Sequence, residues 1–186
     1  ESRGPYLSFT NGILCKTQHA VSIFSALHAD THYLGFTGGE VSARTSSERK
    51  DYRLALHVAG NSQFKGTQRV MACWQRHPEW PELVVVSQHL DTTPAANIRV
   101  EKNLTNNELN TLWAQAGFAV LPSEVEGYGQ VLAEAMAYGC ITITTDAPPM
   151  NELVGKDRGF LAHVERNLTF RLGTRYLVSE QALERS

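Results

Sequence analysis

The chain has 186 residues, of which 42% are hydrophobic and 19% are charged, and its formal net charge is −2. This length suits one domain of ordinary size or a domain with a short appendage, and the composition supports a packed core and excludes a disordered chain. No block of like charges occurs, which argues against a nucleic-acid-binding surface and against a polybasic membrane patch.

The first fifty residues predict a small strand–helix–strand unit. The segment ILCKT (13–17) is typical of a strand, HAVSIFSALH (19–28) of a helix and HYLGFT (32–37) of a second strand. The polar stretch GGEVSARTSSERKD (38–51) then predicts a linker or an exposed loop. We therefore divide the chain into residues 1–50, which hold this unit and the linker, and a larger domain at residues 51–186.

Strands and helices alternate through the larger domain. Apolar runs predict strands at LALHVAG (54–60), ELVVVSQ (82–88), NIRVEK (97–102), FAVLPS (118–123) and CITITTD (140–146). Helices are predicted at residues 66–81, stopped by prolines; at 104–117, opened by the Thr105–Glu108 capping box and closed by Gly117; and at 129–139. The pattern weakens after Phe160. The alternation predicts an α/β fold with a doubly wound parallel sheet.

Ligands of such sheets bind outside the carboxyl ends of the strands. Three loops of this chain fall there, at residues 60–65, 123–129 and 146–150. The third, within TTDAPPMNELV (144–154), is made rigid by two prolines, and by itself it is typical of an ordinary loop. The first two loops carry more specific features.

The loop at residues 123–129 precedes a helix and carries one of two spaced glutamates. Glu126 and Glu134 are eight residues apart, and Gly127 and Gly129 let the backbone approach a ligand closely. The helix start favours a phosphate, and a carboxylate on a helix that is small or apolar nearly all round needs hydrogen-bond donors. A nucleotide-diphosphate sugar would supply both. The residues alone also allow an ordinary strand–turn–helix with two structural glutamates.

The loop in AGNSQFKGT (59–67) also suggests phosphate binding. A glycine follows the strand, and Lys65 stands just before a helix start, where the helix dipole disfavours a cation without a partner. Lys65 would act as a point charge on a phosphate, although the order Lys65–Gly66 is not that of a P-loop. A solvated lysine is the alternative.

Histidines and cysteines predict no metal site. The seven histidines show no HExxH pattern, and no Asp-x-Asp occurs in the sequence. Three scattered cysteines are typical of a reducing cytosol, and no apolar run reaches the roughly 20 residues of a membrane span. We therefore expect a cytoplasmic protein without a cofactor.

Taken together, AGNSQFKGT and the segment from LTNNELN through PSEVEGYGQVLAEAMAYG to NELV (104–154) resemble a known family. They are similar to the donor-binding C-terminal domain of the retaining, GT-B fold glycosyltransferases of family four, the glycosyl transferases group 1. The Glu-x7-Glu element from Glu126 to Glu134, with Gly-Tyr-Gly after the first glutamate, is that family's most specific signature. The ordered motifs cover roughly residues 54–161.

The resemblance implies a role for each motif residue. Glu126 would hold hydroxyls of the donor sugar and Glu134 those of the ribose. Lys65 and the backbone N–H groups of residues 129–131 would hold the diphosphate, and the strand end at residues 100–102 would flank the base. Glu126 and Lys65 are the implied catalytic residues. The implied binding residues are Gly60, Asn61, Lys65, Val100, Lys102, Glu126, Gly127, Tyr128, Gly129, Gln130, Val131 and Glu134.

The implied function is retaining transfer of a hexosyl group from a nucleotide-diphosphate sugar to a hydroxyl of a glycan, lipid or small molecule, without a metal, in carbohydrate biosynthesis. Residues 51–186 would be the donor domain, and residues 12–36 look like the end of an acceptor domain that is otherwise missing. That missing domain could place the protein at a membrane surface. A stand-alone nucleotide-sugar-binding module and a sugar-nucleotide epimerase are the alternatives.

One departure from the family concerns the phosphate loop. The family usually has an arginine directly after its first glycine, whereas this chain has Asn61, and the loop is one residue shorter. One cationic phosphate contact is therefore lost or supplied elsewhere.

Overall fold

The computed structural model describes residues 7–35, 49–90 and 95–186. Most of the predicted linker, residues 38–48, lies outside the described residues, as do the last two residues of the predicted strand at 32–37. The predicted division of the chain at residue 50 stays a prediction.

A six-stranded parallel sheet forms the centre of the molecule, as predicted. Its spatial order is β5-β4-β3-β6-β7-β8, and each neighbouring pair is parallel. The strands are β3 (Asp51–Gly60), β4 (Glu82–Ser87), β5 (Ile98–Glu101), β6 (Ala116–Leu121), β7 (Ile141–Thr145) and β8 (Gly159–Ala162). The order reverses between β3 and β6, so the loops after these two strands face each other across a topological switch point.

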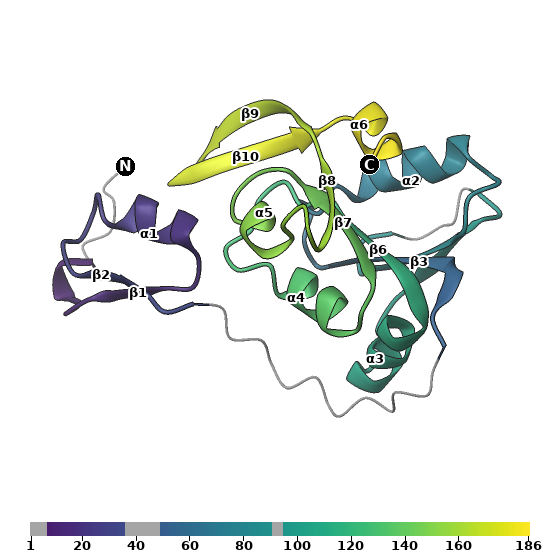
Figure 1. Cartoon of the computed structure of the whole chain (residues 1–186), viewed down its shortest axis with the longest axis horizontal. Coiled ribbons are helices and arrows are strands. Elements are labelled where there is room, and N and C mark those ends of the chain that lie inside the picture. The colour runs from purple at the N-terminus through teal and green to yellow at the C-terminus, as the bar shows by residue number, and fades with distance from the viewer. Residues whose placement is uncertain (1–6, 36–48, 91–94) are drawn as a thin grey trace.

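Helices cover both faces of the sheet (Figure 1). One face carries α2 (Thr67–Arg76) and α6 (Glu180–Glu184); the other carries α3 (Asn106–Gln115), α4 (Gln130–Ala137) and the short α5 (Met150–Leu153). Along β4, Val84 and Val86 belong to one core while Leu83 and Val85 belong to the other. Burial on both faces explains why this strand is continuously apolar rather than alternating.

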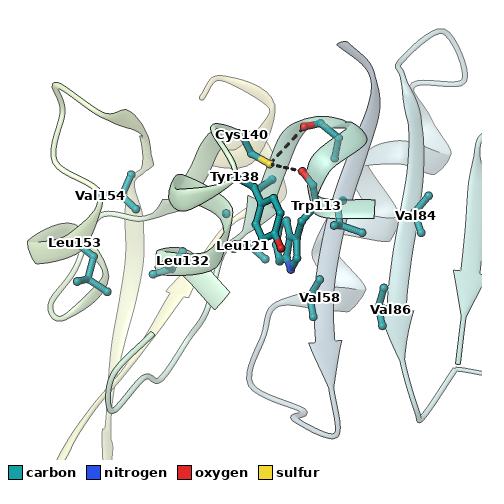
Figure 2. Close-up of a cluster of buried hydrophobic side chains, with 14 of the residues drawn as sticks. Val58, Val84, Val86, Trp113, Leu121, Leu132, Tyr138, Cys140, Leu153 and Val154 are labelled. Atoms are coloured by element: carbon teal, nitrogen blue, oxygen red, sulfur yellow. Dashed lines mark hydrogen bonds between the residues drawn. The ribbon is translucent and has the colours of Figure 1, made fainter. Parts of the chain in front are cut away.

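The prediction that Gly117 closes the α3 helix is wrong. The helix ends at Gln115, and its last carbonyls accept from other groups: Lys50 Nζ lies 2.7 Å from the Trp113 oxygen and 2.9 Å from the Ala116 oxygen. The Cys140 thiol also approaches both carbonyls (Figure 2). Gly117 instead lies in β6, where an added Cβ would come within 2.7 Å of the Tyr52 Cα in β3.

The N-terminal unit forms beside the main domain. It consists of the 3₁₀ turn η1 (Leu7–Phe9), β1 (Ile13–Cys15), α1 (Gln18–Phe24) and β2 (Thr31–Tyr33), with β1 and β2 parallel. The Thr17 side chain caps α1 by accepting from Ala20 N. The predicted strand–helix–strand order is thus confirmed, with shorter elements.

The C-terminal part holds elements that the weak sequence pattern did not predict. After β8, the strands β9 (Val164–Phe170) and β10 (Gly173–Val178) pair with each other in an antiparallel hairpin. The hairpin is separate from the six-stranded sheet and runs along the upper side of the view in Figure 1, from near α1 to α6.

Candidate functional site

Two loops at the carboxyl ends of β3 and β6 form the centre of the candidate site. Residues 61–66 connect β3 to α2, and residues 122–129 connect β6 to α4. Gly66 has a φ of +70°, and an added Cβ would lie 2.5 Å from the carbonyl oxygen of Pro122. A side chain at Gly66 would therefore force the loops apart. The two sequence motifs meet directly in the fold.

Lys65 and Glu126, the two residues predicted to be catalytic, form an ion pair between these loops. Their side chains are 15% and 10% exposed, so the pair is largely removed from water. Ser123 Oγ also donates to Glu126 Oε1 at 2.7 Å. Removal of one partner of such a buried pair strongly destabilises the fold, because the remaining charge is left without compensation.

The start of α4 lies directly after this pair. Gly129 is the N-cap residue in the left-handed conformation, with a φ of 76°, and no side chain among the described residues caps the helix. The N–H groups of Leu132 and Ala133 bond to the Gly129 carbonyl, while those of Gln130 and Val131 precede the first intrahelical bonds. Amides at a helix start in this position are able to donate to an anion, and their role as a phosphate site stays a prediction.

Glu134 is less isolated than its helix pattern predicted. The buried face of α4 consists of Leu132 and Ala135, whereas Glu134 is half-buried and accepts from Gln130 Nε2 at 2.8 Å. The sequence predicted that this carboxylate needs hydrogen-bond donors, and Gln130, one helical turn earlier, supplies one of them. This bond uses one of the two carboxylate oxygens of Glu134.

The other predicted binding residues surround the two loops at different distances. Gly60 ends β3, and Asn61 is exposed with its carbonyl oxygen 2.9 Å from His89 Nε2. Val100 and Lys102 lie at the carboxyl end of β5, the outermost strand, with β4 between them and β3. The structure thus places them at the same edge of the sheet, but further from the central pair.

The loop at residues 123–129 also contacts the N-terminal unit. Gly127 is exposed, and the ring of the half-buried Tyr128 lies 4.1 Å from Lys16 Nζ, measured to its centroid. In the third predicted loop, Asp146 Oδ1 accepts from Asn151 Nδ2 at 3.1 Å. Just beyond it, the Glu152 carboxylate accepts from the N–H groups of Gln18 and His19, at 2.8 Å each. The first turn of α1 is therefore anchored beside the site.

Sequence reasoning missed a second ion-pair cluster in the same loop. Glu124, with a side chain only 4% exposed, pairs with Arg69 of α2 and with Arg175 of β10, whose Nε lies 2.6 Å from Glu124 Oε2. Arg175 comes from the hairpin that the sequence pattern did not predict, so no local signal pointed to this contact. Two arginines from separate elements meet one buried carboxylate.

Sequence reasoning also missed a buried histidine behind both loops. His57 of β3 is fully buried; its Nδ1 donates to the Val120 carbonyl at 2.6 Å, and its Nε2 accepts from Thr67 Oγ1 at 2.9 Å. Burial lowers the pKa of His57 to about 4, although the Val120 carbonyl opposes this shift. The neutral ring joins the central strands to the first residue of α2.

A polar cavity of about 640 Å³ adjoins the two loops. Its lining includes Gly66, Arg69, Glu124, Arg175 and His89. Neither Lys65 nor Glu126 lines it among the residues that the structure describes, so the cavity lies next to the central ion pair and does not contain it.

The described residues offer neither a metal site nor a membrane-spanning helix. Residues 7–35, 49–90 and 95–186 contain no group of three or more histidine, cysteine or acidic side chains placed to hold a metal ion. None of their helices combines the length and apolar composition needed to cross a membrane.

Comparison with known proteins identifies one family. Residues 42–185 match the family model described as "Glycosyl transferases group 1". No curated protein matches the chain.

Several solved structures share the fold. A structure of WaaG, described as a glycosyltransferase involved in lipopolysaccharide biosynthesis, has a TM-score of 0.70 at 16% identity and covers 92% of this chain and 51% of its own. Anabaena HepE in complex with UDP-glucose has a TM-score of 0.65 at 14% identity, covering 83% and 50%. The pneumococcal O-GlcNAc transferase GtfA with UDP and GlcNAc has a TM-score of 0.64 at 15% identity, covering 83% and 34%. The chain therefore spans about half or less of these proteins.

Proposed function

The chain belongs to the glycosyl transferases group 1 family, and from this premise we propose that residues 51–186 bind a nucleotide-diphosphate sugar as donor for glycosyl transfer. The observation that carries the proposal is the Lys65–Glu126 ion pair, placed between two loops and directly before the open start of α4. This arrangement offers a cation and helix amides to a phosphate, and a carboxylate to sugar hydroxyls.

We propose that the ion pair opens when the donor binds. A diphosphate carries more negative charge than one carboxylate, so it competes with Glu126 for the Lys65 ammonium. Glu126 then loses its cation but gains the hydroxyl donors of the sugar, while Ser123 Oγ keeps it oriented. Each buried charge thus has a partner before and after binding, because Lys65 then pairs with a phosphate and Glu126 accepts from hydroxyls.

The proposed reaction is substitution at the anomeric carbon with retained configuration. As the bond from this carbon to the diphosphate breaks, negative charge grows on the leaving oxygen, where Lys65 and the N–H groups of Gln130 and Val131 can stabilise it. The acceptor hydroxyl attacks from the same face and passes its proton to that leaving oxygen. No protein nucleophile takes part in this proposal, and the charge stabilisation comes from the chain, without a metal.

The acceptor and the location are further proposals. The acceptor is a hydroxyl compound that enters from the side of the N-terminal unit, because Lys16 and the start of α1 lie against Tyr128 and Glu152. We also propose a cytoplasmic location, since the three cysteines, Cys15, Cys73 and Cys140, are free and buried, which suits a reducing compartment.

Calorimetry tests donor binding directly. UDP, GDP and ADP are titrated into the protein with a chelator present, and one of them should bind and raise the unfolding free energy by about 2.7 kcal/mol at 100 times its dissociation constant. Lys65→Ala should weaken that binding by roughly ten- to a hundredfold. The exposed Lys156, changed to alanine, is the matched control. If no diphosphate binds, or if binding requires a divalent cation, the proposal fails.

A further inference from the structure

The hairpin β9–β10 contacts both loops of the site through Phe170, Arg175 and Tyr176. Arg175 Nε donates to Glu124 Oε2 at 2.6 Å, and the backbone N–H of Tyr176 donates to the Glu124 carbonyl at 2.8 Å. The Phe170 ring packs edge-on against Phe64, with centroids 5.1 Å apart, and Arg175 lies over the same Phe64 ring at 5.1 Å. The hairpin is therefore attached to the loop after β3 and to the loop after β6.

Glu124 is the centre of this arrangement. Its backbone N–H donates to the Phe64 carbonyl at 2.8 Å, and its carboxylate pairs with Arg69 of α2 as well as with Arg175. With a side chain 4% exposed, Glu124 needs these partners to be buried at all. The polar groups of Glu124 thus connect its own loop to the loop after β3, to α2 and to β10.

The residues held in this way are neighbours of the proposed ligand-binding residues. Phe64 directly precedes Lys65, and Glu124 is two positions before Glu126. Lys65 and Glu126 must keep their mutual position if a diphosphate and a sugar are to be bound together. Loops fixed before binding lose less conformational entropy when the ligand arrives.

We infer that the hairpin β9–β10 is a positioning element of the donor site, and that Arg175 acts through Glu124 and Phe64 to fix the position of Lys65 relative to Glu126. The inference rests on the proposed donor binding. Arg175 touches no reacting atom in this account, and its effect passes through the loops. The hairpin sets donor affinity by keeping the empty site close to its bound geometry.

Two substitutions of Arg175 separate the effect of its charge from the effect of its side-chain packing. Arg175→Met removes the ion pair while keeping a long, unbranched side chain. It should weaken binding of the nucleotide diphosphate roughly tenfold. Arg175→Lys keeps the charge and should recover part of the loss. Arg166→Met, at an exposed arginine of the same hairpin, is the matched control and should leave affinity unchanged. Unchanged affinity in Arg175→Met, with normal binding by the wild type, overturns the inference and leaves the proposed function standing.

Hydrogen exchange supplies a readout that does not depend on the ligand. In the protein without ligand, Arg175→Met should speed amide exchange in residues 61–66 and 122–129 while β4 and β7 exchange as in the wild type. Uniform acceleration throughout the sheet would mean that Arg175 only stabilises the fold, which overturns the inference. If Arg175→Met does not fold, Phe170→Ala takes its place, because it removes the second hairpin contact and should accelerate the same two loops. A wild type that binds no diphosphate defeats the proposed function, and the loop exchange still decides whether the hairpin holds the loops.

Discussion

Two carboxylates of one loop, Glu124 and Glu126, are both largely removed from water and both paired with cations, but their surroundings differ. Glu124 has two arginines from different elements and donates and accepts through its backbone as well. Glu126 has one lysine and one hydroxyl. Arginine forms a planar fork that fixes a carboxylate, whereas lysine is a flexible point charge. We therefore expect the Glu124 cluster to hold the two loops in place, and we propose that Lys65 exchanges Glu126 for a phosphate of the ligand.

Stability measurements should show the largest contrast between the two clusters. Glu124→Ala leaves two arginines close together without their buried carboxylate, so we expect the free energy of unfolding to fall by roughly 3–5 kcal/mol. Glu126→Ala should lower it by about half as much, because the Lys65 ammonium can move toward water on its flexible stem. Urea denaturation of both variants measures this. Equal losses would contradict the assignment of different roles.

The His57 ring links β6 to the start of α2 behind the two loops, and its titration should change the stability of the whole fold. The pKa of His57 is about 4 in the folded protein and near the ordinary 6.5 when unfolded, so the unfolded chain takes up the proton first as pH falls. Its contribution to stability is complete above pH 6.5 and is lost toward pH 4, at about 1.4 kcal/mol per pH unit, or about 3 kcal/mol in total.

Denaturation from pH 7 to pH 4 on the wild type and on His57→Asn isolates this contribution. Asparagine cannot take up the proton but can still donate to the Val120 carbonyl. The variant should therefore show a shallower fall of the unfolding free energy over this range. Parallel curves for the two proteins would show that other groups cause the acid sensitivity.

Glu134 sharpens the comparison, because its partner Gln130 is neutral. Glu134→Gln should change the unfolding free energy by less than about 0.5 kcal/mol. It should nevertheless weaken the nucleotide diphosphate and its sugar conjugate alike, by about ten- to a hundredfold, since a hydrogen bond to a charged group contributes roughly 1.5–3 kcal/mol. Calorimetry with both ligands measures this, and an unchanged affinity for both would place Glu134 outside the site.

The sequence predicted the parallel sheet and the position of the two loops at the carboxyl ends of its strands because these depend on local patterns. Each local pattern predicts the structure of the segment in which it occurs, as do the continuous apolar strands, the prolines after α2 and the glycines at loop ends. Gly117 shows where such reasoning ends: its role is set by the approach of Tyr52 from a distant strand, and the end of α3 is set by Lys50.

The candidate site divides in the same way. Lys65, Glu126 and the start of α4 could be predicted because they belong to short motifs with a known order. Arg175 and the two arginine contacts of Glu124 could not, because they join segments 51 and 55 residues apart, and the hairpin that carries Arg175 has only a weak strand pattern. His57 reads in the sequence as part of an apolar strand, and only its contacts with Val120 and Thr67 give it a role.

Ligand exchange at the Lys65–Glu126 pair is the central claim, and titration of Glu126→Gln with two ligands tests it most directly. If the diphosphate must draw Lys65 away from Glu126, then the bare nucleotide diphosphate should bind Glu126→Gln at least as tightly as it binds the wild type. The nucleotide sugar should bind the variant roughly ten- to a hundredfold more weakly, because the carboxylate that accepts from its hydroxyls is gone. Equal weakening of both ligands would contradict the account and would make the ion pair a fixed part of the fold.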